Sequence, residues 1–328
     1  MSAGSPKIYY FCPDSMLPSA GIRRLYRHID LLHKAGFDAA ILHVQQGFRR
    51  EDMPQVPISY FNDVVIESSA IVVIPEGMTY IMKILQEFSV RRFVIALNWD
   101  YVFKNIPDGL DWRSFGIERA LVISPAIGHM ITWSMGLPVH ILESSIDHRR
   151  YRYDPDSKQP QLAFIKRKGI NIDQLKRMMG ARNDAYINNI RWVGLDGLSE
   201  SEYAREIGRS SIFLNLSLAE GYPTSCLEAM AAGAIVVSYD SLCGRNILCG
   251  RGAEQNCVLA PNGDYLALAY AMEPVLRDCL DGRMDRWRSI IAGGRRTAAG
   301  VTVEGEKRSL ISFWRKACCA HDGIDSES

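Results

Sequence analysis

The sequence predicts an α/β protein made of two doubly wound domains, each built around a parallel sheet. With 328 residues, the chain exceeds the ~250–300 at which a single hydrophobic core stops growing. Short, continuous apolar runs, typical of strands buried on both faces, alternate with helical patterns. This alternation breaks once, at a polar stretch, and then resumes. We therefore expect two domains, residues 1–150 and 151–328.

The first half carries the strand and helix signals of one such domain. Its strand-like runs cover residues 7–12, 39–44, 70–76, 92–100, 120–125 and 139–145. The clearest helix is residues 20–36, where isoleucines and leucines recur at helical spacing and Gly36 stands at the end. Consecutive parallel strands need crossover connections, which such helices supply.

A polar stretch at residues 147–161 is rich in charge and proline, and it is expected to link the two domains. The second half then repeats the pattern. Its strands are expected at residues 162–165, 190–194, 211–218 and 234–240, and its last helices at residues 263–280, 284–300 and 304–319.

Composition narrows the class of partner. The chain has 38 Lys and Arg and 37 Asp and Glu residues, which gives a net charge of +1. This balance offers no broad positive field for nucleic acid, which is therefore not an expected partner. Eight cysteines show no CxxC or zinc spacing, which indicates reduced thiols in a cytoplasmic protein and no metal site. No signal peptide is evident, and no apolar run approaches the ~18 residues that span a bilayer. A peripheral membrane contact stays open.

The stretch "AEGYPTSCLEAMAAG", residues 219–233, places two glutamates, Glu220 and Glu228, on either side of a turn. It directly follows the strand expected at 211–218. Ligands of doubly wound sheets bind beyond the carboxyl ends of the strands, so both carboxylates are expected at a ligand site.

The same stretch predicts where a helix begins. Pro223 disfavours the helical conformation at Tyr222, so the helix should begin near Thr224 or Ser225, with Glu228 in its first turn. Amides at a helix start favour phosphate, and a carboxylate can accept hydrogen bonds from sugar hydroxyls. Together they fit a nucleotide sugar.

The alternative is structural. Ser225 and Glu228 also form an [ST]-x-x-[DE] pattern, in which Glu228 would reach back to the backbone of Ser225 as part of a capping box. Glu220 would then be an ordinary loop acid.

Residues 219–238 resemble the E-x7-E signature of retaining glycosyltransferases with the GT-B fold, above all family 4, the glycosyl transferases group 1. Further similar segments are residues 141–151, 164–169, 191–194 and 258–272. The resemblance implies two Rossmann-like domains facing across a cleft, with the acceptor on the first domain and the nucleotide-sugar donor on the second.

The resemblance also implies roles. Glu228 would bind the ribose of the donor, Glu220 would contact the transferred sugar, and Arg167 with Lys168 would neutralise the departing diphosphate. Cationic side chains would then replace a metal ion, and no metal or cofactor is expected. The alternative for Arg167 and Lys168 is a solvated strand end. The other residues expected around the donor are Gly21, Gly221, Tyr222, Thr224 and Ser225.

The acceptor side is expected in the first domain, where Asn98 and Asp100 follow a strand. Arg23 is a further candidate for an anionic acceptor, although Arg23 and Arg27 at helical spacing also fit a solvated helix face. Trp99 and Tyr101 fit equally well beneath such a site. Three histidines, His28, His43 and His129, are expected to be structural.

Two positions depart from the family pattern. Lys166 precedes Arg167 where a glycine is common, and Asn246 stands where a carboxylate is expected. The sequence leaves the base, the sugar and the acceptor open, and a glycan, a lipid-linked group, a protein or another hydroxyl, even that of a hydroxylated base, fits. The rival functions are a nucleotide-sugar epimerase on the same fold and a non-catalytic module that binds nucleotide sugars.

Overall fold

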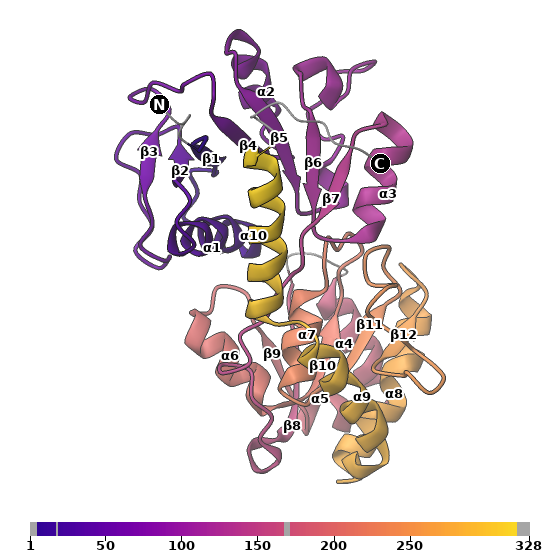
Figure 1. Cartoon of the computed structure of the whole chain (residues 1–328). Coiled ribbons are helices and arrows are strands. Elements are labelled where there is room, and N and C mark those ends of the chain that lie inside the picture. Colours follow the sequence, from indigo (N-terminus) through magenta and orange to yellow (C-terminus); the bar gives the residue numbers. More distant parts are fainter. Residues whose placement is uncertain (1–4, 18, 167–170, 320–328) are drawn as a thin grey trace. The chain divides into compact units, whose positions relative to one another are not determined.

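The computed structural model describes residues 5–17, 19–166 and 171–319 (Figure 1). Contacts divide the chain into two compact units, one formed by Met1–Glu143 with Glu304–Ser328 and the other by Ser144–Val303. This division differs from the expected one in two ways: the first unit already ends at residue 143, and the last helix joins the first unit instead of the second.

The first unit contains a parallel sheet, as predicted from its continuous apolar runs. Within the described residues it has seven strands in the order β3-β2-β1-β4-β5-β6-β7, and every pair is parallel. The strands are β1 (Ile8–Phe11), β2 (Ala39–His43), β3 (Ile58–Tyr60), β4 (Ile71–Pro75), β5 (Arg91–Ala96), β6 (Arg119–Val122) and β7 (Val139–Ile141). Strand β3 was not predicted, since it is short and only half-buried at the edge of the sheet.

Helices complete the first unit. They are α1 (Ala20–Lys34), α2 (Thr79–Ile84), α3 (Pro125–Met135) and α10 (Val303–Cys319), with 3-10 turns η1 (Leu85–Glu87), η2 (Trp99–Tyr101) and η3 (Trp112–Phe115). Figure 1 shows α10, in yellow, alongside α1. Trp314 of α10 is fully buried, and its Nε1 donates to the Tyr10 hydroxyl at 3.2 Å. This apolar packing explains why residues 304–319 join the first unit.

The second unit has a five-stranded parallel sheet in the order β12-β11-β10-β8-β9 within the described residues. Its strands are β8 (Gln159–Phe164), β9 (Arg191–Gly194), β10 (Ser210–Asn215), β11 (Ile235–Tyr239) and β12 (Val258–Ala260). Its helices are α4 (Ile172–Arg182), α5 (Ala185–Asn188), α6 (Glu200–Arg209), α7 (Thr224–Ala231), α8 (Tyr265–Leu280) and α9 (Arg288–Ala299), with 3-10 turns η4 (Pro155–Ser157) and η5 (Met284–Trp287).

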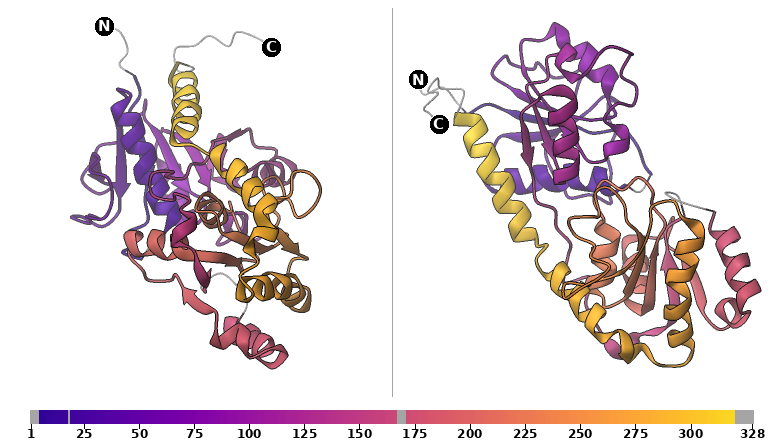
Figure 2. Two further views of the ribbon diagram at one scale, coloured as in Figure 1. Left: turned by 90° about the horizontal axis from the view of Figure 1, so that it is seen from below. Right: turned by 90° about the vertical axis from the view of Figure 1, so that its right-hand side faces the viewer.

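Helices cover both faces of this second sheet (Figure 2). Successive residues of β10 point to opposite faces, so Ile212 and Leu214 pack with α4 and α8 while Phe213 packs with α7. Because both faces are buried, every residue of β10 is buried. The predicted doubly wound α/β class is confirmed, and all carboxyl ends of the strands lie at one edge of each sheet.

No helix among the described residues is both long and apolar enough to cross a membrane. All eight cysteines are free thiols, and five of them are buried.

Candidate functional site

The loops at the carboxyl edge of the second sheet are drawn together by asparagines. Asn215, the last residue of β10, donates from Nδ2 to Ser238 Oγ at 3.0 Å and accepts from the backbone amide of Ser217 at 3.3 Å. Asn262, just after β12, donates to the carbonyl of Leu218 at 3.5 Å. The chain that leaves β10 is thereby anchored to its neighbours before it reaches Glu220.

Helix α7 begins at Thr224, as predicted from the proline that precedes it. Its N-cap is Pro223, and no side chain caps it. Ser225 therefore lies inside the helix, and the capping-box alternative is wrong. Glu228 is the fifth residue of α7, so the expectation of a first-turn carboxylate is also wrong. Pro223 supplies the fixed φ of a helix start, so the helix begins at the next residue and Glu228 falls beyond its first turn.

The carboxylate of Glu228 is held by a tyrosine from α6 instead. The Tyr203 hydroxyl donates to Glu228 Oε2 at 2.9 Å, and the ring of Tyr203 meets that of Tyr151 edge-on at 6.3 Å. Burial raises the pKa of both phenols, and the negative charge of Glu228 raises them further. Both tyrosines thus keep their protons, and Tyr203 acts as a donor to the glutamate.

Helix α6 is itself fixed at its start by a complete capping box. Ser199 Oγ accepts from the amide of Glu202 at 3.3 Å, and the Glu202 carboxylate accepts from the amide of Ser199 at 2.9 Å. This box positions the helix that presents Tyr203.

The remaining predicted donor residues of this unit lie together in the loop and the first turn of α7. Glu220 and Tyr222 are half-buried and flank Gly221, which is buried. Thr224 and Ser225 are half-buried in the first turn. The side chain of Tyr222 packs against the core formed by α7 and β11.

Two buried hydroxyls at this edge were missed by the sequence reasoning. Ser217 and Ser241 follow β10 and β11 by two positions, and within the described residues neither Oγ has a hydrogen-bond partner. A buried polar group left unpaired costs about 1–3 kcal/mol, so both hydroxyls are suited to bind a polar ligand. The signal in the sequence was a serine at the same distance past two neighbouring strands.

Arg167 and Lys168, predicted to meet the diphosphate, lie outside the described residues. Strand β8 ends at Phe164, and the amide of Lys166 donates to Asp196 Oδ2 at 2.5 Å. Asn246 lies exposed in the loop after β11. In the part of the chain that the structure describes, no group of three or more His, Cys, Asp or Glu side chains is placed to hold a metal ion.

The carboxyl edge of the first sheet gathers the acceptor candidates around a buried glutamate. Glu76 follows β4, and its Oε1 accepts from the amides of Leu97 and Asn98 at 3.1 and 2.9 Å. Burial raises the pKa of Glu76 to about 7. Asn98 in turn caps η2 by accepting from the amide of Asp100 at 3.1 Å. Asn98 and Asp100 are thus held side by side, and the sequence reasoning did not single out Glu76.

Gly21 lies at the same edge. It is the second residue of α1 and not part of the turn before it, and a Cβ added there would lie 3.2 Å from Leu97 Cδ1. The tight packing of α1 against the chain after β5 explains the small residue.

A match to a protein-family model identifies the class of enzyme. The model of the family described as glycosyl transferases group 1 matches residues 169–278, a segment that contains both Glu220 and Glu228. The chain is a glycosyltransferase. No curated protein matches the sequence.

Solved structures share the fold of this glycosyltransferase at low sequence identity. Sucrose-phosphate synthase from Thermosynechococcus elongatus superimposes with a TM-score of 0.66 at 11% identity, covering 96% of this chain and 100% of that one. HepE from Anabaena in complex with UDP gives 0.67 at 12%, covering 94% and 100%. The pneumococcal O-GlcNAc transferase GtfA in complex with UDP and GlcNAc gives 0.63 at 9%, covering 98% and 100%. The glycosyltransferase thus has the two-domain GT-B fold.

The basic residues of α1 are largely engaged within the first unit of the glycosyltransferase. Arg27 binds the buried Glu306 of α10 through Nε at 2.8 Å and Nη2 at 3.0 Å, so it does not belong to a solvated helix face. Arg23 is half-buried, and it adds to the larger effect of Arg50 in lowering the pKa of Asp52.

Two of the histidines are buried among partners. His43 lies between Asp14 Oδ1 at 2.6 Å and the Tyr26 hydroxyl at 2.8 Å, and His28 Nε2 lies 3.4 Å from Glu306 Oε1. Of the two aromatic residues near Asn98, Trp99 is half-buried, whereas Tyr101 is 41% exposed. Tyr101 therefore does not pack beneath the edge.

Proposed function

We propose that this glycosyltransferase moves a sugar from a nucleoside-diphosphate sugar to an acceptor hydroxyl, with retention of configuration and without a metal ion. The observation that carries the proposal is Glu228. It caps no helix, it is half-exposed at the ligand-binding edge of a doubly wound sheet, and a protonated tyrosine orients it. Neighbours with the same fold hold UDP in their crystals.

In this proposal Glu228 accepts hydrogen bonds from the ribose hydroxyls. A carboxylate is suited to that task because it only accepts, and its bonds to hydroxyls are charge-assisted. The buried hydroxyls of Ser217 and Ser241 would bind further polar atoms of the donor. Gly221 would let the backbone approach the ligand closely.

Glu220 contacts the transferred sugar, whereas Arg167 and Lys168 neutralise the diphosphate as it leaves. Negative charge grows on the leaving group in the transition state, and fixed cations and the uncapped amides of α7 stabilise it there. The acceptor lies at the carboxyl edge of the first sheet, with Asn98 and Asp100 as its polar contacts. We place the enzyme in the cytoplasm, because eight free cysteines fit a reducing compartment.

Turnover of the donor tests this proposal against its rivals. A panel of nucleotide sugars is first screened by thermal shift, since a ligand at 100 times its Kd stabilises the fold by ~2.7 kcal/mol. The donor that binds is then followed by NMR. Slow hydrolysis without acceptor, with the α or β configuration of the donor kept, supports a retaining transferase. Epimerised donor would mean an epimerase, and tight binding without chemistry a binding module.

Metal independence has its own test. We expect turnover to be unchanged in EDTA, because side chains and amides supply the positive charge. Complete loss of activity, restored by manganese or magnesium, would show that a metal ion takes part.

A further inference from the structure

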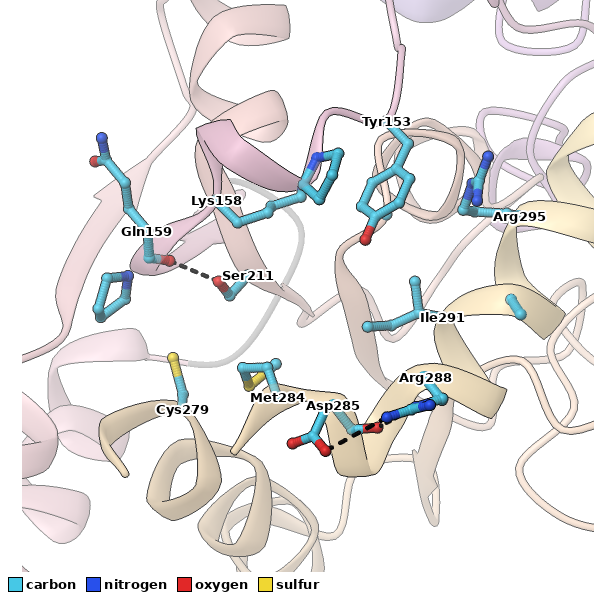
Figure 3. Close-up of a pocket in the computed structure, with 14 residues that line it drawn as sticks. Tyr153, Lys158, Gln159, Ser211, Cys279, Met284, Asp285, Arg288, Ile291 and Arg295 are labelled. Atoms are coloured by element: carbon cyan, nitrogen blue, oxygen red, sulfur yellow. Dashed lines mark hydrogen bonds and ion pairs between the residues drawn. The ribbon is translucent and has the colours of Figure 1, made fainter. Parts of the chain in front are cut away.

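A pocket of about 530 Å³ opens at the amino edge of the second sheet (Figure 3). It is formed by the chain leading into β8, the first two residues of β8, Ser211 of β10, Gly233, the turn η5 and the helices α8 and α9. Because all strands of this sheet are parallel, this edge is opposite to the carboxyl edge that carries Glu220. The pocket is therefore separate from the proposed donor site, and its volume lies in the ~300–1,000 Å³ range of small-molecule sites.

Positive charge prevails around this amino-edge pocket. Its lining includes three basic residues, Lys158, Arg288 and Arg295, and a single carboxylate, that of Asp285. Asp285 Oδ2 already lies 3.5 Å from Arg288 Nη2. The guanidinium of Arg295 lies over the ring of Tyr153 at 4.5 Å, and among the described residues it has no carboxylate partner. The excess charge favours an anion.

Lys158 supplies a partly desolvated amine. Its Nζ donates to the carbonyl of Ser210 at 2.8 Å, which uses one of the three donors of an ammonium group. Burial lowers the pKa of Lys158 to about 7, although the charge of Asp154 acts in the opposite direction. An anion next to Nζ would offset this desolvation and favour the charged form.

Apart from Gln159 and Ser211, the rest of the lining is apolar, and it includes one flat wall. In Figure 3, Cys279 and Met284 lie on one side of the open space, and Tyr153 and Ile291 lie on the other. The ring of Tyr153 packs directly on Gly233, whose φ is +79°, and a Cβ at that position would collide with the ring. This glycine therefore keeps an aromatic face beside the charged groups.

We infer that the amino-edge pocket binds a small organic anion, in which a phosphate or carboxylate group is joined to a flat apolar body. The anionic group pairs with Lys158 and the arginines, and the apolar body lies against Tyr153 and Ile291. Cationic groups around an apolar, half-enclosed space match both parts of such a molecule.

Pyridoxal 5′-phosphate is a suitable probe, since it joins a phosphate to a flat ring that carries an aldehyde. The neutral Nζ of Lys158 attacks the aldehyde carbon, water leaves, and an imine forms. Added borohydride transfers a hydride to the imine carbon and leaves a stable secondary amine. Peptide mass spectrometry then compares labelling of Lys158 by pyridoxal 5′-phosphate and by pyridoxal, each normalised to the exposed Lys83.

In the wild type we expect the phosphate to raise normalised labelling of Lys158 at least about tenfold, the equivalent of one charge-assisted bond. The preference should fall to about one in the double variant Arg288→Gln/Arg295→Gln. Arg296→Gln, which changes an exposed arginine of α9 outside the pocket lining, is the matched control and should keep it. Affinity for the nucleoside diphosphate of the donor should be unchanged in all of these variants.

A second measurement needs no variant. 4-Nitrophenyl phosphate should protect Lys158 of the wild type from the probe, and 4-nitrophenol should not. A wild-type preference near one, a preference that survives the double substitution, or equal protection by both competitors would overturn the inference.

Discussion

Each unit has a glutamate near the carboxyl edge of its sheet, and the two are held in different ways. Glu76 of the first unit is buried, and it accepts hydrogen bonds from two backbone amides of the next loop. Glu228 of the second unit is half-exposed, and it accepts from the hydroxyl of a tyrosine on another helix.

The difference separates a carboxyl group that holds a neighbouring loop from one that is open to a proposed ligand. The amides of Leu97 and Asn98 donate to the Glu76 carboxyl group, so loss of that group would change the path of the chain around Asn98. The hydroxyl of Tyr203 orients Glu228 without enclosing it. The proposed function therefore gives Glu228 the ribose and Glu220 the transferred sugar, and we expect a structural role for Glu76.

The largest effect is expected for Glu220→Ala. A residue that contacts the transferred sugar acts mainly in the transition state, so turnover should fall by roughly 10²–10³ while affinity for the nucleoside diphosphate changes little. Steady-state kinetics and calorimetry measure the two quantities. Glu254→Ala, which removes an exposed glutamate of the same unit, is the control and should behave as wild type. Turnover equal to that of the control would make Glu220 an ordinary loop acid.

Glu228→Ala should weaken binding of the nucleoside diphosphate by roughly ten- to hundredfold for each lost ribose bond, since charge-assisted bonds contribute ~1.5–3 kcal/mol. The matched control is Asp111→Ala, which removes the complete capping box of η3 in the first unit and should cost ~0.5–2 kcal/mol of stability without loss of affinity. Melting temperature and calorimetric titration are measured on both variants. If they lose stability alike and keep affinity alike, Glu228 has no role in donor binding.

Glu76→Gln tests the structural side of the comparison through pH. The native pKa of Glu76 is about 7 and its ordinary value is 4.5, so the native state keeps this proton where the unfolded state has lost it. Its contribution to stability therefore falls as the pH rises from about 4.5 through about 7, by roughly 3 kcal/mol in all.

Urea unfolding at pH 5 and pH 8 measures this change. The glutamine can still accept both amide bonds, so Glu76→Gln should gain stability relative to wild type at pH 8 compared with pH 5. Glu87→Gln, at an exposed position, should follow the wild type at both values. A constant difference between Glu76→Gln and wild type at the two pH values would contradict the raised pKa.

The smallest effect is expected for Tyr203→Phe. Loss of one neutral donor to Glu228 should weaken binding of the nucleoside diphosphate by about two- to tenfold, since such a bond contributes ~0.5–1.5 kcal/mol. Tyr270→Phe, at a side chain that is 65% exposed, is the control for calorimetric titration. Equal affinity in the two variants would mean that Tyr203 does not orient the glutamate.

The sequence predicted what depends on local pattern. Continuous apolar runs predicted the buried strands, and Pro223 predicted where α7 begins. Contacts between distant positions left no such trace. The bond from Tyr203 to Glu228 joins two helices across 25 positions, and the burial of Glu76 depends on the amides of Leu97 and Asn98 in another loop. Strand β3 was missed because three half-buried residues are too few to show either a continuous apolar run or an alternating hydrophobic pattern.

The return of α10 to the first unit has a consequence for synthesis on the ribosome. Domains generally fold in the order in which they emerge. Here Trp314 completes a core with Tyr10, from which it is separated by 304 positions, whereas the second unit is the continuous segment Ser144–Val303. The second unit can therefore finish folding first, and the half of the protein that is made earliest becomes complete only when its final helix emerges.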